Sequence, residues 1–354
     1  MKIFILSDFY SNYSGNFIPS LLAFKKKAVA LGHCVEFGFS NQNMSPEFLN
    51  WEKPFEKNNK VVLFDFRVDS FVTDVVNYIK QNHIDLVYYH FGSSIKLSQI
   101  KRKCPKSILF YQHIHNSMYE KKNFYAFLKK MRNYFFLDKK IIKICCSRSI
   151  EASAKYIFPK SKIYSVPNSI DFSRLMPSSN NHCGEFSILL FGHNYYIKGV
   201  DVAISAVNEL AKNHDVRLDI VMGDRLEKNT RIIKDTFGGL PSNIKILPPT
   251  QDVVGLYKTH QIFLNASKEE GMSYANIEAY YCGASFIASD IPQNKEPNLP
   301  NTIYFKQGNY KDLVRALLLA NSEADNHFND VEYVQSNFSL DAWAEKILSI
   351  MNLF

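Results

Sequence analysis

The stretch from residue 265 to residue 283 reads NASKEEGMSYANIEAYYCG, and its pattern decides how the rest of the chain is interpreted. The apolar run Ile262–Asn265 leads into it and predicts a buried strand, while Tyr274–Tyr281 predicts a helix after a polar loop. Glu270 ends this loop, and Glu278 follows eight positions later on the helix. The stretch therefore predicts a strand, a loop and a helix that carry two carboxylates at one edge of a sheet.

The start of this helix has the features of a diphosphate site. Gly271, Met272 and Ser273 would begin the helix with backbone N–H groups that have no partner within it, and such an N-terminus attracts anions. Glu278 lies one turn further along, where its carboxylate could accept hydrogen bonds from the two hydroxyls of a ribose. The alternative at this point is that both glutamates are surface charges on an ordinary helix.

Strands and helices alternate on both sides of this stretch, which predicts an α/β fold of two doubly wound parallel sheets. In the second half we expect a helix over Val200–Lys212 and strands over Ser187–Phe191, Leu218–Met222, Ile244–Leu247 and Ser285–Ala288. In the first half we expect strands over Lys2–Leu6, Cys34–Phe39, Val61–Phe64, Leu86–Tyr89, Ile108–Gln112, Ile141–Cys145 and Ile163–Val166.

A polar stretch around Pro177 interrupts this alternation and predicts a linker between two domains. We expect an N-terminal domain over residues 1–172, a linker over 173–184 and a C-terminal domain over 185–330. Helices over residues 331–354 could cross back to the N-terminal domain. Because open α/β sheets bind ligands at the carboxyl ends of their strands, a cleft between the two sheets is the expected site.

Composition excludes several classes of protein. The chain is 46% hydrophobic and 21% charged, as is usual for globular proteins, and no apolar run reaches the ~18–20 residues of a membrane span. Its six cysteines form no CxxC pair, and this usage predicts reduced thiols in a cytoplasmic protein without a bound metal ion.

Charge divides the chain into unlike halves. Residues 1–180 contain 27 Lys and Arg against 13 Asp and Glu, a net charge of +14, and residues 181–354 have a net charge of −6. No nucleic-acid-binding motif accompanies the basic half, so an anionic membrane face or a phosphate-bearing lipid is the expected partner. The alternative is a solvated, lysine-rich surface.

Residues 121–140 mix cations with aromatic residues at helical spacing. Phe127, Met131 and Phe135 form one stripe, which is expected to pack on the sheet while the lysines face water. The competing interpretation is an interfacial helix that contacts anionic lipid.

Four motifs resemble those of family 4 retaining glycosyltransferases, which have the GT-B fold. Glu270 to Gly283 is similar to the family's E-x7-E motif, and Ser289 to Glu296 resembles its S-D-x-x-x-N-[RK]-E segment. The runs FGH at 191–193 and KGVD at 198–201 resemble its phosphate-binding turn, and VPNSID at 166–171 resembles the motif that ends its first domain. The likeness extends over essentially the whole chain.

The resemblance implies a role for each matching residue. Glu278 would bind the ribose, Glu270 would contact hydroxyls of the donor sugar, and Lys198 would neutralise the leaving diphosphate. The backbone N–H groups that complete the phosphate site would belong to Gly15, Met272, Ser273 and Tyr274.

Three histidines complete the implied site. His193 stands where the family has an arginine that faces the phosphates. A family histidine that faces the donor sugar matches His115, although His113 lies on the same side of the predicted strand and stays open as an alternative.

The resemblance implies a metal-independent hexosyltransferase that uses a UDP-sugar and retains the anomeric configuration. The absence of a D-x-D triplet agrees with metal independence. A lipid-diphosphate-linked saccharide is the expected acceptor, in the synthesis of a bacterial surface polysaccharide at the inner face of the cell membrane. A sugar-nucleotide epimerase and a non-catalytic sugar-nucleotide-binding or polysaccharide-binding module are the alternatives.

Overall fold

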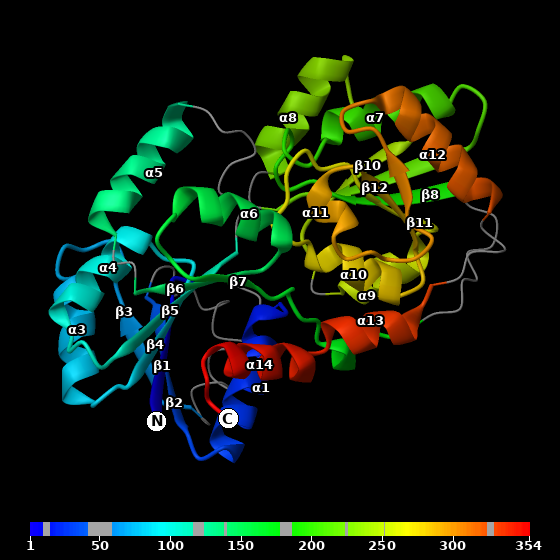
Figure 1. Cartoon of the computed structure of the whole chain (residues 1–354). Helices are drawn as coiled ribbons and strands as arrows, with labels where there is room; N and C mark the ends of the chain where they lie inside the picture. Colours follow the sequence, from blue (N-terminus) through cyan, green and yellow to red (C-terminus); the bar gives the residue numbers. More distant parts are fainter. Residues whose placement is uncertain are drawn as a thin grey trace. The chain divides into compact units, whose positions relative to one another are not determined.

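A computed structural model describes the chain over residues 1–9, 15–41, 59–115, 124–137, 140–177, 186–223, 226–250, 252–323 and 329–354 (Figure 1). These residues form two compact units, one of Met1–Ser169 with Leu340–Phe354 and one of Ile170–Ser339. Residues 178–184 of the linker expected from the sequence lie outside the described residues. Among the described residues, no helix has both the length and the apolar character that a membrane span requires.

The first unit is built on a seven-stranded parallel sheet with the order β3-β2-β1-β4-β5-β6-β7. The strands are β1 Lys2–Ser7, β2 Cys34–Ser40, β3 Val61–Phe64, β4 Leu86–His90, β5 Leu109–Ile114, β6 Ile142–Cys145 and β7 Ile163–Ser165. The helices are α1 Phe17–Ala30, α3 Phe71–Gln81, α4 Ser94–Lys103, α5 Phe124–Phe136, α6 Arg148–Ile157 and α14 Leu340–Ile350.

Two apolar cores enclose this sheet. On one face, α1 and α14 lie side by side, and Trp343 and Ile347 of α14 pack with Phe24 of α1 and Tyr88 of β4 (Figure 1). On the other face, residues of α3 and α4 pack against the opposite side chains of the same strands. The end of the chain therefore completes the core of the first unit.

The second unit has a six-stranded parallel sheet with the order β10-β9-β8-β11-β12-β13. The strands are β8 Phe186–Phe191, β9 Val216–Val221, β10 Ile244–Leu247, β11 Ile262–Asn265, β12 Ser285–Ser289 and β13 Ile303–Phe305. The helices are α7 Val200–Leu210, α8 Leu226–Phe237, α9 Val253–Thr259, α10 Tyr274–Tyr281, α11 Pro292–Lys295, α12 Tyr310–Ser322 and α13 Val331–Phe338. The predicted pair of doubly wound α/β sheets is therefore confirmed.

The expected packing of α5 is wrong. Phe127 and Met131 are 46% and 37% exposed, and Phe135 is 65% exposed, so this stripe does not pack on the sheet. The buried side chains of α5 are Ala126 and Asn133. Helical periodicity identified a real stripe, but the face that contacts the unit is the one with a small residue and an amide.

Strand β6 contains a buried cation. Lys143 is 1% exposed, and its Nζ donates a hydrogen bond of 2.6 Å to Oε1 of Gln112 on β5. The amine also lies 4.4 Å from the ring centroid of Phe158, and among the described residues it forms no ion pair. Burial lowers the pKa of Lys143 from 10.5 to about 7.

This lowered pKa predicts a pH dependence of stability. Between pH 7 and pH 10 the unfolded chain keeps the Lys143 proton while the folded chain has released it, so this group makes the free energy of unfolding rise with pH. The slope from this group is at most about 1.4 kcal/mol per pH unit. We expect Lys143→Met to be most stabilising, relative to the wild type, at pH 6, with the difference shrinking towards pH 10 in urea unfolding.

Lys106→Met, at an exposed lysine, serves as the control for this experiment. A stability difference between Lys143→Met and the wild type that stays constant from pH 6 to pH 10 would contradict the lowered pKa.

Candidate active site

A close backbone approach in the second unit brings two predicted site residues together. Gly199 has a φ of +63°, and a Cβ atom there would lie 2.2 Å from the carbonyl oxygen of Ala266. The turn before α7 therefore needs glycine on both counts. The N–H of Lys268 donates a 2.7 Å hydrogen bond to the carbonyl of Ile197, which joins the turn to the loop after β11.

This contact places Lys198 beside Glu270, 72 residues later in the chain. Nζ of Lys198 lies 2.5 Å from Oε1 of Glu270, and their side chains are 14% and 10% exposed. Oε1 of Glu270 also accepts hydrogen bonds from Ser267 Oγ at 2.7 Å and Asn265 Nδ2 at 3.3 Å. The two residues expected to contact different parts of a donor thus form one ion pair in the described structure.

A chain of buried amides and hydroxyls holds the loop that carries Glu270. Asn265 donates to Asn276 of α10 at 2.7 Å, and Asn276 donates to Asn294 of α11 at 3.1 Å. Asn294 in turn donates to Ser289 Oγ at 3.0 Å, whose hydroxyl donates to the carbonyl of Ser267 at 2.5 Å. All four side chains are at most 5% exposed, so each hydrogen bond replaces one lost to water.

The N-terminus of α10 follows three residues after Glu270. Ser273 is the N-cap residue, but its side chain makes no capping hydrogen bond, and the first turn contains no acidic residue. Met272 is buried, while Ser273 and Tyr274 are partly exposed. The positive end of the helix dipole therefore belongs to the residues that directly follow the loop of Glu270.

Glu278 is more deeply buried than its expected role suggests. It is 5% exposed, and its Oε2 accepts a 3.0 Å hydrogen bond from the hydroxyl of Tyr257. Oε1 forms an ion pair with Arg174. Burial, together with the Glu278 charge, raises the pKa of Tyr257 well above 10, so this hydroxyl keeps its proton and donates.

Sequence reasoning missed Arg174 and Tyr257. Arg174 lies three residues after the VPNSID motif, a position that could have marked it, whereas Tyr257 lies in α9 and belongs to no motif.

Two other predicted site residues, His193 and Gly15, lie in different units. His193 is exposed, and its carbonyl accepts a hydrogen bond from Asn229 Nδ2 at 3.4 Å. Gly15 belongs to the first unit, where its φ of +52° makes the turn before α1.

Three histidines form a cluster in the first unit, at the carboxyl ends of β4 and β5. His90 pairs with His113 in the sheet register, and His115 follows immediately after β5. Nδ1 of His90 lies 3.0 Å from Nε2 of His115, and the hydroxyl of Tyr88 lies 2.6 Å from Nδ1 of His113. Burial lowers the pKa of all three imidazoles below 6.5, so the cluster is neutral at pH 7.

The sequence spacing did not indicate this cluster, because its members come from neighbouring strands. Their ring nitrogens lie within 4.8 Å of one another, a grouping that could supply three ligands to a metal ion. However, the rings of His113 and His115 are stacked 4.4 Å apart at 12°, so their in-plane lone pairs run parallel instead of converging. The described arrangement is a hydrogen-bonded imidazole stack, and the cluster contains both histidines that the sequence left open.

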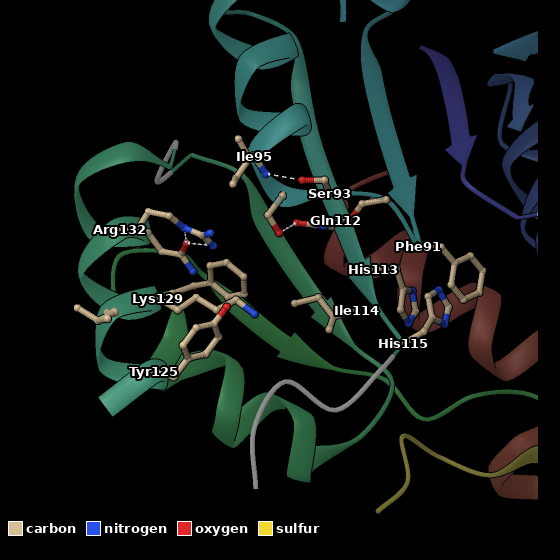
Figure 2. Close-up of a pocket in the computed structure, with 15 residues that line it drawn as sticks. Phe91, Ser93, Ile95, Gln112, His113, Ile114, His115, Tyr125, Lys129 and Arg132 are labelled. Carbon is tan, nitrogen blue, oxygen red and sulfur yellow. Dashed lines mark hydrogen bonds between the residues drawn. The ribbon is translucent and has the colours of Figure 1, made fainter. Parts of the chain in front are cut away.

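Figure 2 shows the pocket next to this cluster, a cavity of about 690 Å³ in the first unit. His113 and His115 line one side of it, and residues of α5 line the other. The first unit thus has a cavity of the size that small-molecule sites have in proteins.

Comparisons with known proteins agree with this architecture. Residues 185–321 match the family model described as glycosyl transferases group 1. Over 263 residues, which is 70% of each chain, this protein is 25% identical to the capsular polysaccharide biosynthesis glycosyltransferase CapH of Staphylococcus aureus.

Solved structures resemble the chain over its whole length. The structure of Alr3699/HepE from Anabaena in complex with UDP has a TM-score of 0.76, at 15% identity and 100% coverage of both chains. A glycosyltransferase from Rickettsia africae has a TM-score of 0.75, at 19% identity, covering 99% of this chain and 97% of its own. The chain therefore has the GT-B fold, and the two sequence matches support glycosyltransferase activity.

Proposed function

We propose that this chain is a family 4 retaining glycosyltransferase that transfers a hexose from a UDP-sugar to a lipid-diphosphate-linked saccharide. The reaction needs no metal ion and contributes to a bacterial capsule or another surface polysaccharide at the inner face of the cell membrane. The likeness to CapH supports a role in capsular polysaccharide synthesis, and the likeness to structures of HepE described as complexes with UDP and with UDP-glucose supports a UDP-sugar donor.

The observation that carries the proposal is the Lys198–Glu270 pair just before the N-terminus of α10. An ammonium group has three N–H donors, so Lys198 can keep its bond to Glu270 and still donate to a departing diphosphate. The helix N-terminus adds backbone donors for the same charge. The three described donors to Glu270 all bond its Oε1. In this proposal, Oε2 accepts hydrogen bonds from hydroxyls of the donor sugar.

Glu278 is proposed to bind the ribose. Arg174 and Tyr257 hold its carboxylate in one orientation. His115 is proposed to face the donor sugar, with His113 as the alternative. Transfer with retention then depends on holding the acceptor hydroxyl on the leaving-group side, where the departing phosphate can take its proton.

The proposed contact with the membrane is supported by the exposed face of α5. Phe124, Phe135 and Phe136 are 75%, 65% and 66% exposed, and Lys129, Lys130 and Arg132 interleave with them. Aromatic residues interleaved with cations are typical of helices that lie in the headgroup region of an anionic bilayer. The exposure of these aromatic residues favours the interfacial-helix interpretation over the expected packing on the sheet.

Replacing Glu278 tests the donor site. Glu278→Gln removes the charge but keeps the shape, and we expect it to weaken UDP-sugar binding by about ten- to a hundredfold, because one charge-assisted acceptor is lost. Glu278→Ala should weaken binding similarly and also lower the free energy of unfolding by about 1–3 kcal/mol, since Tyr257 and Arg174 lose their acceptor. Calorimetric titration and urea unfolding measure the two effects.

Glu269→Gln is the matched control, because Glu269 lies on the loop before α10, next to Glu270, and has no assigned role. If Glu278→Gln binds UDP-sugars as tightly as Glu269→Gln does, Glu278 is not the ribose ligand.

The role of α5 is tested with lipid vesicles. We expect the wild type to sediment with anionic vesicles at low salt and to be released as salt screens the attraction over ~10 Å. The double variant Phe135→Ser/Phe136→Ser should bind several-fold more weakly, because two exposed aromatic rings no longer enter the interface.

Phe354→Ser removes an equally exposed phenylalanine outside α5 and should leave vesicle binding unchanged. Binding that is equal for neutral and anionic vesicles, or equal for the double variant and the wild type, would contradict the proposed contact.

A further inference from the structure

The pocket in Figure 2 has a strongly one-sided set of charges. Lys129 and Arg132 line it from α5, and no Asp or Glu is among the described residues that line it. Lys129 extends from α5 towards Ile114 on β5 (Figure 2). Arg132 donates to the Asn133 side chain from Nε at 3.3 Å and from Nη2 at 3.1 Å, so its described partner is neutral. The positive charge of this guanidinium is therefore not cancelled by its neighbour.

A buried amine, that of Lys143, lies behind the pocket wall. Gln112 lines the pocket, and its Oε1 accepts from the buried Lys143 at 2.6 Å and from Ser94 Oγ at 2.8 Å. Gln112 is held further by its Nε2, which donates to the carbonyl of Gly92 at 3.1 Å. The pKa of Lys143 is about 7, so its amine is only partly protonated at neutral pH, and an anion in the adjacent cavity would favour the charged form.

The N-terminus of α4 also favours an anion in this pocket. Ser93 and Ser94 line the pocket at the start of this ten-residue helix, and Ser93 caps it by accepting from the N–H of Ile95. The partial positive charge at this end of the helix adds to the field of Lys129 and Arg132.

We propose that this pocket binds a phosphate or diphosphate group of the acceptor, held by Arg132 and Lys129 and bordered by Gln112, His113 and the start of α4. The identity of the ligand as an acceptor rests on the proposed function, whereas the binding of a phosphate by these residues does not. Arg132 supplies the fork of N–H donors that suits a phosphate, and Tyr125 and Phe158 supply apolar walls for the group attached to it.

Inorganic pyrophosphate is the probe for this site, titrated calorimetrically into the full chain with saturating UDP present to occupy the proposed donor site. We expect Arg132→Gln to weaken pyrophosphate binding by about tenfold or more. The double variant Lys129→Gln/Arg132→Gln should show no binding over the same range of pyrophosphate concentrations. UDP affinity, measured separately, should be unchanged in both variants. If the wild type does not bind UDP, the proposed donor site is wrong, but the pocket assignment is not affected.

Lys130→Gln is the matched control, because Lys130 lies on α5 above the ring of Tyr156 and does not line the pocket. It should bind pyrophosphate like the wild type. Equal weakening in Lys130→Gln and Arg132→Gln would mean that the general charge of α5 attracts the anion, and the pocket assignment would be wrong. No pyrophosphate binding by the wild type would also overturn it.

Glucuronate serves as a second probe, because a carboxylate sugar could use the same cations. We expect it to bind at least tenfold more weakly than pyrophosphate, since it presents one singly charged group. Glucuronate binding that is as tight as that of pyrophosphate, and equally sensitive to Arg132→Gln, would overturn the phosphate assignment in favour of an acidic sugar.

Discussion

The second unit depends on one close contact between backbones, where Gly199 meets the carbonyl of Ala266. A side chain at position 199 would separate the turn before α7 from the loop after β11, and Lys198 would then lose contact with Glu270. The loop side of this contact is held by the amide chain from Asn265 to Asn294. A cation, a carboxylate and a helix N-terminus thus keep one arrangement before any ligand arrives, which lowers the cost of ordering them on binding.

The cations at the two candidate sites have different kinds of partner. In the second unit, Lys198 and Arg174 are each paired with a glutamate, so a bound ligand adds to existing ion pairs. In the first unit, Lys143 is buried against a neutral amide, and Arg132 contacts another. A ligand with its own negative charge gains more from a cation with a neutral neighbour, such as Arg132, than from a paired one, and this difference fits the proposed phosphate-bearing acceptor for the first unit.

The sequence predicted local structure well wherever a motif and a periodicity agreed. The helix Tyr274–Tyr281 and the strand Ile262–Asn265 have the expected bounds, because strand, loop and helix signals follow one another directly. Contacts between distant segments were harder to predict. His90 meets His115 through the register of two parallel strands, and the pair Arg174–Glu278 joins residues 104 positions apart. The predicted packing of α5 was wrong, because helical periodicity defines an apolar face of the helix without showing whether that face contacts the sheet.

The central claim is that nucleotide is released when a sugar moves from a nucleotide donor to an acceptor. The most direct test measures UDP release from a panel of UDP-sugars, with and without a lipid-diphosphate-linked saccharide, and analyses the products. The account predicts rapid UDP release with one donor only when the acceptor is present, together with a glycoside that keeps the anomeric configuration of the donor. Free epimerised sugar nucleotide formed without acceptor, or donor binding that never leads to UDP release with any acceptor, would contradict it.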